Sequence, residues 1–363
     1  MPMENIQEIP IFFILGRPRS GTTLLTTLFN AHPNVRIAPE FPILLPLYQK
    51  FRKVRDWDEA AIRSFADHLF RHYVFNNRTL DHYMLKKEDF TANLMELKHR
   101  GTVQDFLKCI NYHSFSVYEK QKTLRIGDKN PVYSIFIKRF LKIFPEAKFI
   151  CIVRDYRDNF VSIKKLSELK MEAPILPLQV YRWKYAVRGF LKYRRKYPDR
   201  IRIVRYEDLV TDQEKTVKEL FEYIGIAYDP AVFDFYKKKD ETLKAYNDPL
   251  IEKFHGSLMN PVNTSRMNQW KKDLSAEQVR TADHIAGKYA DMFNYDRERK
   301  QFSAALWLKS LPMQGYGYLL FRLMYYGSYL PYRLSLWLSV KLLFLVRTYS
   351  RFFGSKSKGD QVK

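Results

Sequence analysis

The segment IFFILGRPRSGTT, residues 11–23, decides the fold of this chain. Its first five residues are all apolar and stop abruptly at Gly16, which is the pattern of a buried parallel strand followed by a loop. Residues 22–30 then place three leucines on one helical face. The chain is therefore predicted to begin with a strand, a glycine-containing loop and a helix.

The loop at 16–23 has the composition of an anion-binding site. It precedes a helix N-terminus, where backbone N–H groups favour negative charge. Gly21 allows a ligand to approach closely, and Arg17 and Arg19 add positive charge. The spacing matches the phosphate loop G-x-x-x-x-G-K-[ST], but Thr22 replaces the lysine that contacts the β- and γ-phosphates. This replacement disfavours ATP and GTP, and a glycine turn with incidental arginines is the alternative interpretation.

Two later segments repeat the pattern of an apolar run followed by polar residues. Residues 149–153 and 201–204 are predicted strands, and helices are expected from Asn159 onward and over 214–224. Residues 45–125 have helical periodicity and predict an insertion beside the sheet. Strands separated by helices indicate an α/β fold, with a P-loop NTPase-like parallel sheet flanked by helices.

Composition limits the classes of function. The chain has 363 residues, of which 46% are hydrophobic, so a large core is expected and disorder is disfavoured. Its 62 Lys and Arg against 39 Asp and Glu give a net charge of +23. Such an excess predicts a negatively charged partner, which is nucleic acid, a membrane surface or a phosphate- or sulfate-bearing ligand.

The two cysteines and the N-terminus bear on the compartment. Cys109 and Cys151 form no C-x-x-C pair, so neither a zinc site nor a disulfide framework is indicated, and a reducing compartment fits. Residues 1–10 lack the basic and apolar regions of a signal peptide. No run of about 18 apolar residues predicts a transmembrane helix. We expect a cytoplasmic location, either free or peripheral on the inner face of the membrane.

The composition changes after about residue 302. Residues 302–363 contain nine Lys or Arg, one acid and fourteen aromatic residues. We therefore predict a catalytic domain over 1–300 and a helical, basic and aromatic tail over 301–363. The mixture favours an anionic membrane interface through 303–363. A helix docked on the domain and a homodimer contact are the alternatives, and nucleic acid is not expected because the basic residues are spread among aliphatic ones.

Four blocks of sequence together resemble the PAPS-dependent sulfotransferases, where PAPS is 3′-phosphoadenosine 5′-phosphosulfate. RPRSGTT at 17–23 resembles the 5′-phosphosulfate loop, and GDKNP at 127–131 with the run 144–159 resembles the segment that holds the 3′-phosphate. VRYEDLV at 204–210 and the stretch 261–270 resemble the blocks that usually follow, the last of which closes over the nucleotide. The likeness covers about residues 9–296. It is closest to the tyrosylprotein and glycan sulfotransferase branch, because AHPNVR at 31–36 is followed by Glu40.

The resemblance implies a role for each matching residue. Three residues are predicted to be catalytic, with the first as general base and the others meeting charge on the leaving phosphate: Glu40, Lys129 and Arg19. Lys129 is expected in a rigid turn before a helix. Residues that bind PAPS are predicted at the 5′ end, at the 3′-phosphate and near the adenosine: Arg17, Arg19, Ser20, Gly21, Thr22, Thr23, Arg154, Ser162 and Tyr206. A core position is the alternative for Tyr206.

Some family positions differ in this chain. The basic residue often found four after Ser162 is Leu166, the lysine that often precedes Pro-Val-Asn is Asn260, and the loop 254–260 looks short. These departures affect the closing loop rather than the predicted binding site for the donor nucleotide. No metal site is expected, since the donor carries its own leaving group and needs no magnesium. The eight histidines are expected in packing or surface roles.

The acceptor stays open at this point. A hydroxyl or an amine on a glycan, a lipid or a lipid-linked molecule fits the sequence. A P-loop kinase is the alternative enzyme, although the loop lysine and a magnesium-binding acid are missing. A catalytically inactive anion- or membrane-binding protein of the same fold is the alternative of another class, although Glu40 and Lys129 are both present.

Overall fold

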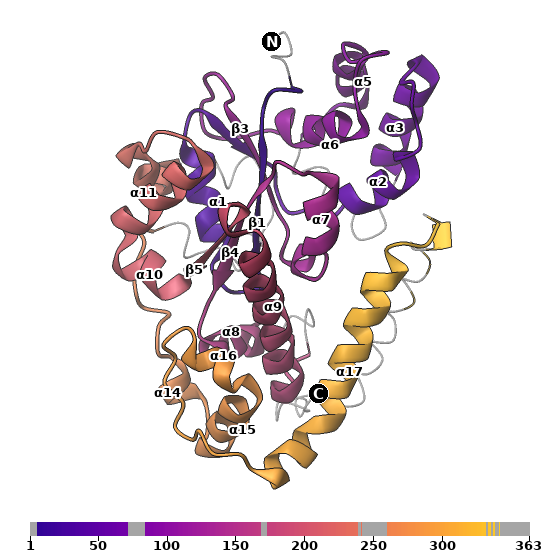
Figure 1. Ribbon diagram of the computed structural model, residues 1–363. Coiled ribbons are helices and arrows are strands. Elements are labelled where there is room, and N and C mark those ends of the chain that lie inside the picture. Colours follow the sequence, from indigo (N-terminus) through magenta and orange to yellow (C-terminus); the bar gives the residue numbers. More distant parts are fainter. Residues whose placement is uncertain are drawn as a thin grey trace, which may run out of the picture. The chain divides into compact units, whose positions relative to one another are not determined.

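The computed structural model describes residues 6–71, 84–167, 173–238, 241, 260–331, 333–334, 337 and 341 (Figure 1). The chain forms two compact units, and each is built from two separate stretches of sequence. The first unit comprises residues 1–154 and 189–265, and the second comprises residues 155–188 and 266–363. The domain boundary near residue 300 stays a prediction.

A five-stranded sheet forms the centre of the first unit, in the order β2-β3-β1-β4-β5 (Figure 1). All its strand pairs are parallel. The strands are β1 (Ile11–Gly16), β2 (Val35–Ile37), β3 (Arg125–Lys129), β4 (Lys148–Val153) and β5 (Ile201–Arg205). The predicted α/β fold is confirmed, and so are the three strands that were predicted from apolar runs.

Aromatic side chains of β1 join the sheet to helices on its two faces, because successive side chains of a strand point in opposite directions. Phe12 packs on Phe29 of α1 (Thr22–Ala31), with ring centroids 5.2 Å apart. Phe13 packs on Phe140 of α7 (Ile137–Ile143) at 4.9 Å. The sheet is therefore buried on both sides, which explains why β1 and β4 are almost continuously apolar.

The other helices of the first unit include the predicted helical insertion and the predicted helix at 214–224. The described residues of the insertion between residues 45 and 125 contain α2 (Leu44–Phe51), α3 (Glu59–Arg71), α5 (Lys87–Met95) and α6 (Val103–Tyr112). After β5 come α10 (Tyr206–Thr211) and α11 (Gln213–Ile224). Gly225 ends α11 with a left-handed φ of 75°, a conformation that glycine adopts without strain.

The strand β3 corrects one sequence-based expectation. Lys129 is the last residue of β3 rather than part of a turn, and a 3₁₀ helix over Pro131–Ile135 follows it. The segment RIGDK has only one large apolar residue, so it carries no strand signal of its own. Its neighbours bury it instead: a Cβ added at Gly127 would lie 2.6 Å from Ile37 of β2.

The second unit is helical. It contains α8 (Tyr156–Ser167), the start of α9 (Leu176–Lys196), α14 (Trp270–Asp273), α15 (Ala276–Ala286), α16 (Lys288–Asp291) and α17 (Ala304–Gly327). The helix α8 begins three residues before its predicted start. Most of the tail after residue 331 lies outside the described residues. Within the described part of the chain, no helix is both long enough and apolar enough to cross a membrane.

Candidate active site

The predicted phosphate loop lies between β1 and α1, as expected. Gly21 is the N-terminal cap of α1 and has a φ of 93°, and the first turn of α1 contains no acidic residue. A Cβ at this position would lie 2.5 Å from Cδ2 of Tyr206. Thr22 and Thr23 open the helix, where the first backbone N–H groups have no intrahelical acceptor. The loop is thus shaped to receive an anion at the helix N-terminus.

Arginines lie around this loop. Arg17 is buried, and the Nη1 of Arg154 donates a hydrogen bond to the carbonyl oxygen of Arg19 at 3.0 Å. Arg154 directly follows β4, and its guanidinium carbon lies 4.6 Å from the ring centroid of Tyr206. Arg154 therefore contacts both the loop and the tyrosine that packs on Gly21. A group of three cations beside a helix N-terminus fits a ligand with several negative charges.

The predicted residue Ser20 shares in this loop. Its side chain is buried, and its backbone N–H donates to the carbonyl oxygen of Arg17 at 3.1 Å, which closes the turn. Tyr206 is also buried, at 6% exposure. Sequence reasoning did not anticipate that Tyr206 supports the loop by packing on Gly21.

Two of the three residues predicted to be catalytic, Lys129 and Glu40, form an ion pair. The Nζ of Lys129 lies 2.6 Å from Oε2 of Glu40. Lys129 ends β3, where its register partner in β1 is Ile14, so it lies at the same end of the sheet as the phosphate loop. The side chain of Lys129 is only 6% exposed, whereas that of Glu40 is 48% exposed. The carboxylate is thus accessible from solvent, and the buried ammonium of Lys129 holds it in place.

A buried polar cluster supports Lys129, and sequence reasoning missed it. Asp128 accepts hydrogen bonds from Nδ2 of Asn130 at 2.7 Å and from Nδ2 of Asn111 at 3.2 Å. Burial raises the pKa of Asp128 to about 6, although these hydrogen bonds and the charge of Lys129 lower it. The motif at 127–131 already indicates this cluster in the sequence, because the polar residues Asp128 and Asn130 alternate with Lys129 along one extended segment.

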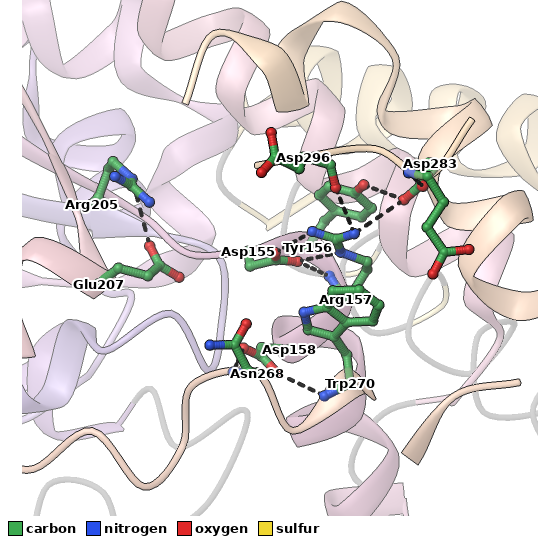
Figure 2. Close-up of polar contacts among 11 residues, drawn as sticks. Asp155, Tyr156, Arg157, Asp158, Arg205, Glu207, Asn268, Trp270, Asp283 and Asp296 are labelled. Carbon is green, nitrogen blue, oxygen red and sulfur yellow. Dashed lines mark hydrogen bonds and ion pairs between the residues drawn. The ribbon is translucent and has the colours of Figure 1, made fainter. Parts of the chain in front are cut away.

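In the second unit, Figure 2 shows Arg157 enclosed by acidic and aromatic groups. Its Nη2 and Nε bind Asp155 at 2.7 and 3.0 Å, and its Nη1 donates to the carbonyl oxygen of Asp296 at 2.9 Å. The guanidinium stacks on Trp270, with its carbon 3.8 Å from a ring centroid. Asp283 accepts from the hydroxyl of Tyr156 and lies 3.6 Å from Arg157. A charge as deeply buried as Arg157 requires such compensation.

The neighbouring Asp158 anchors the end of the predicted closing loop. Its carboxylate accepts the backbone N–H groups of Asn268 at 2.7 Å and of Trp270 at 2.9 Å (Figure 2). Asp158 lies on α8, the helix that also carries the half-buried Ser162. The role of Ser162 stays a prediction. Of the loop 254–260, which looks short in the sequence, only Asn260 lies within the described residues.

The described residues offer no candidate metal site. Across the ranges that the structure describes, no group of three or more His, Cys, Asp or Glu side chains is arranged to hold a metal ion.

Known proteins share sequence similarity with this chain. The sequence profile of the sulfotransferase family matches residues 10–230. The protein-tyrosine sulfotransferase of Drosophila melanogaster is 25% identical over 288 residues, which cover 77% of this chain and 50% of the fly protein. The protein-tyrosine sulfotransferase 1 of Danio rerio is 26% identical over 304 residues, which cover 80% of this chain and 73% of the fish protein.

Solved structures with a similar fold include two sulfotransferase domains. The domain from the Synechococcus PCC 7002 olefin synthase is 21% identical with a TM-score of 0.53, and the alignment covers 82% of this chain and 98% of that domain. The domain from the curacin biosynthetic pathway is 20% identical with a TM-score of 0.51, covering 79% and 98%. At these identities the likeness concerns the fold.

Proposed function

Because this chain belongs to the sulfotransferase family, we propose that it transfers the sulfuryl group of PAPS to the phenolic hydroxyl of a tyrosine in a protein acceptor. The predicted membership in the PAPS-dependent family, near the tyrosylprotein branch, is confirmed. The tyrosine acceptor is a proposal, because this chain matches about half the length of the fly tyrosylprotein enzyme and most of the length of the fish one.

The ion pair between Lys129 and Glu40 is the observation that carries the proposal. A hydroxyl acceptor must lose its proton as its oxygen attacks sulfur, and a carboxylate that faces solvent is a suitable base. Glu40 offers such a carboxylate, and the 2.6 Å contact to the buried Lys129 fixes its position. Without a positioned base the fold supports anion binding but not efficient transfer to a phenol.

The donor is PAPS, and the residues around the phosphate loop fit it. The backbone of the loop, the hydroxyls of Thr22 and Thr23, and Arg17 provide donors and positive charge for a phosphosulfate. In the reaction, the acceptor oxygen bonds to sulfur, the bond from sulfur to the bridging phosphate oxygen breaks, and the proton passes to Glu40. The charge left on the departing phosphate is balanced by Arg19 and Lys129.

Calorimetry with the product nucleotide tests the donor site. We expect 3′-phosphoadenosine 5′-phosphate to bind tightly, and ATP with magnesium to bind weakly or not at all, because Thr22 occupies the position of the kinase lysine. A preference for ATP would instead favour the P-loop kinase. The absence of any nucleotide binding would favour an inactive anion-binding protein.

Transfer of labelled sulfate from PAPS tests the acceptor. A peptide with a single tyrosine is compared with the same peptide carrying phenylalanine at that position. Label in the tyrosine peptide alone supports the proposal. Label that appears only in a glycan, a lipid or an amine, with PAPS still consumed, would overturn the tyrosine acceptor but keep the sulfotransferase.

The homodimer and the cytoplasmic location of this protein remain predictions.

A further inference from the structure

The helix α17 exposes a row of large apolar side chains. Leu308, Leu319, Leu323 and Tyr326 are 61%, 57%, 47% and 52% exposed. Their separations of 11, 15 and 18 residues from Leu308 place all four on one side of a helix with 3.6 residues per turn. Contiguous exposed apolar surface of this kind marks a contact with a partner or a lipid phase.

The opposite side of α17 is already packed, which fixes the orientation of the exposed row. Phe321 is buried, and its ring lies 4.9 Å from that of Tyr185 of α9. A Cβ at Gly317 would lie 3.0 Å from side-chain atoms of both Leu178 and Tyr181. The helix is therefore apolar on its packed side and on its outer side, and only the outer side lacks a covering element among the described residues.

The charge of this region selects the partner. The helix α17 contains no acid, and of its two cations Lys309 is paired with Glu277 of α15 at 2.6 Å, which leaves Arg322 to act on a partner. Residues 302–363 contain nine basic residues against one acid. The guanidinium carbon of Arg322 lies 4.7 Å from the ring centroid of Tyr326, so a cation accompanies the apolar row. A second copy of this chain would bring like charges together, whereas an anionic surface complements them.

We propose that α17 lies flat in the interface of an anionic membrane and attaches the enzyme to it. The row Leu308–Tyr326 faces the acyl boundary, and Arg322 contacts lipid phosphates. The aromatic residues Trp307 and Tyr318, 43% and 49% exposed, suit the headgroup level. With 24 residues, α17 is about 36 Å long, which accommodates the whole apolar row and Arg322.

Vesicle flotation of the full-length protein tests the proposal. The probe is phosphatidylcholine vesicles with and without phosphatidylserine. We expect binding only with phosphatidylserine, and weaker binding as salt rises. Leu319→Glu should reduce the bound-to-free ratio roughly tenfold or more, because an interfacial leucine is lost and a negative charge is added. The control Met292→Glu adds the same charge at a 57% exposed position outside α17 and should bind like the wild type.

Any of the following three results would overturn the proposal. Equal binding of the wild type and Leu319→Glu would show that α17 is not the contact. Equal binding to neutral and anionic vesicles would remove the role of charge. A dimer seen by light scattering that Leu319→Glu dissociates, without vesicle binding, would assign the row to a second copy. Binding of 3′-phosphoadenosine 5′-phosphate by both variants reports that they are folded, and it separates failure of this proposal from failure of the proposed enzyme activity.

Discussion

Replacing Glu40 with glutamine removes the proposed base while keeping its size and an oxygen that can accept from Lys129. The side chain is 48% exposed, so the fold should tolerate the change within about 0.5 kcal/mol. General base catalysis contributes about 10²–10⁴ in rate. We therefore expect kcat to fall by that factor, which corresponds to about 3–5 kcal/mol in activation free energy.

The assay follows sulfate transfer from labelled PAPS to the tyrosine peptide at saturating donor. Binding of 3′-phosphoadenosine 5′-phosphate, measured by calorimetry, should stay within about threefold of the wild type, because Glu40 does not belong to the phosphate loop. The matched control is Glu59→Gln on α3. Glu59 is also about half exposed and also paired with a cation, Arg63 at 2.7 Å, but it belongs to neither the phosphate loop nor the Lys129–Glu40 pair.

Two results would refute the assignment of Glu40. The first is a kcat within about threefold of the wild type, which would mean that another group or water takes the proton. The second is a loss of nucleotide affinity as large as the loss of kcat, which would mean that the Lys129–Glu40 pair maintains the donor site rather than the chemistry.

Three further predictions concern residues that support the site. Gly21→Ala should weaken binding of 3′-phosphoadenosine 5′-phosphate at least about tenfold in calorimetry, because a φ of 93° and a 2.5 Å approach to Tyr206 exclude a Cβ. The control Gly189→Ala should bind the nucleotide normally, because a Cβ at position 189 has nothing within 4 Å. Equal affinities of the two variants would contradict the loop geometry. Asp158→Ala should lower the free energy of unfolding by about 2–4 kcal/mol in urea unfolding, since two backbone N–H groups lose a charged acceptor. Asp158→Asn should lose less of that free energy. An unchanged urea midpoint of Asp158→Ala would be evidence that Asp158 does not anchor the loop. For Asp128, with its pKa raised to about 6, the folded protein holds more protons than the unfolded one between pH 4 and 6, so its contribution to the free energy of unfolding falls by about 2–3 kcal/mol as pH rises through that range; Asp128→Asn should remove that fall, and identical pH profiles of the two proteins would contradict it.

The sequence predicted those strands that carry their own hydrophobic signal. The apolar residues of β1, β4 and β5 were sufficient. The strands β1 and β4 are buried on both faces of the parallel sheet, and the edge strand β5 keeps Ile201 and Val204 buried. The strand β2 has three residues, and β3 reads Arg-Ile-Gly-Asp-Lys, so neither shows periodicity. Their strand conformation comes from pairing with neighbours, which no local pattern reports.

For the site, the identities of the residues could be predicted from the sequence, but their partners could not. Glu40 and Lys129 were both predicted to be catalytic, yet their 2.6 Å contact joins positions 89 residues apart and depends on the order of strands in the sheet. Likewise, Arg154 was predicted as a ligand of the 3′-phosphate, while its hydrogen bond to the Arg19 carbonyl oxygen links it to the 5′ loop. A sequence motif identifies the functional side chains, but only the tertiary structure shows which of them interact.

The residues that sequence reasoning missed share one property: their partners are other groups of the protein. A ligand dictates the type and spacing of the residues that touch it, so Arg17 and Gly21 stand in a recognisable motif. The requirement on Asp128 and Asp158 comes instead from amide and backbone N–H groups brought close by folding. Any buried acceptor of the right length would satisfy those donors, so no residue type is fixed in advance. Variants at Asp128 and Asp158 should therefore act on stability and nucleotide affinity, and variants at Glu40 on kcat, which makes the division between supporting and reacting groups measurable in one protein.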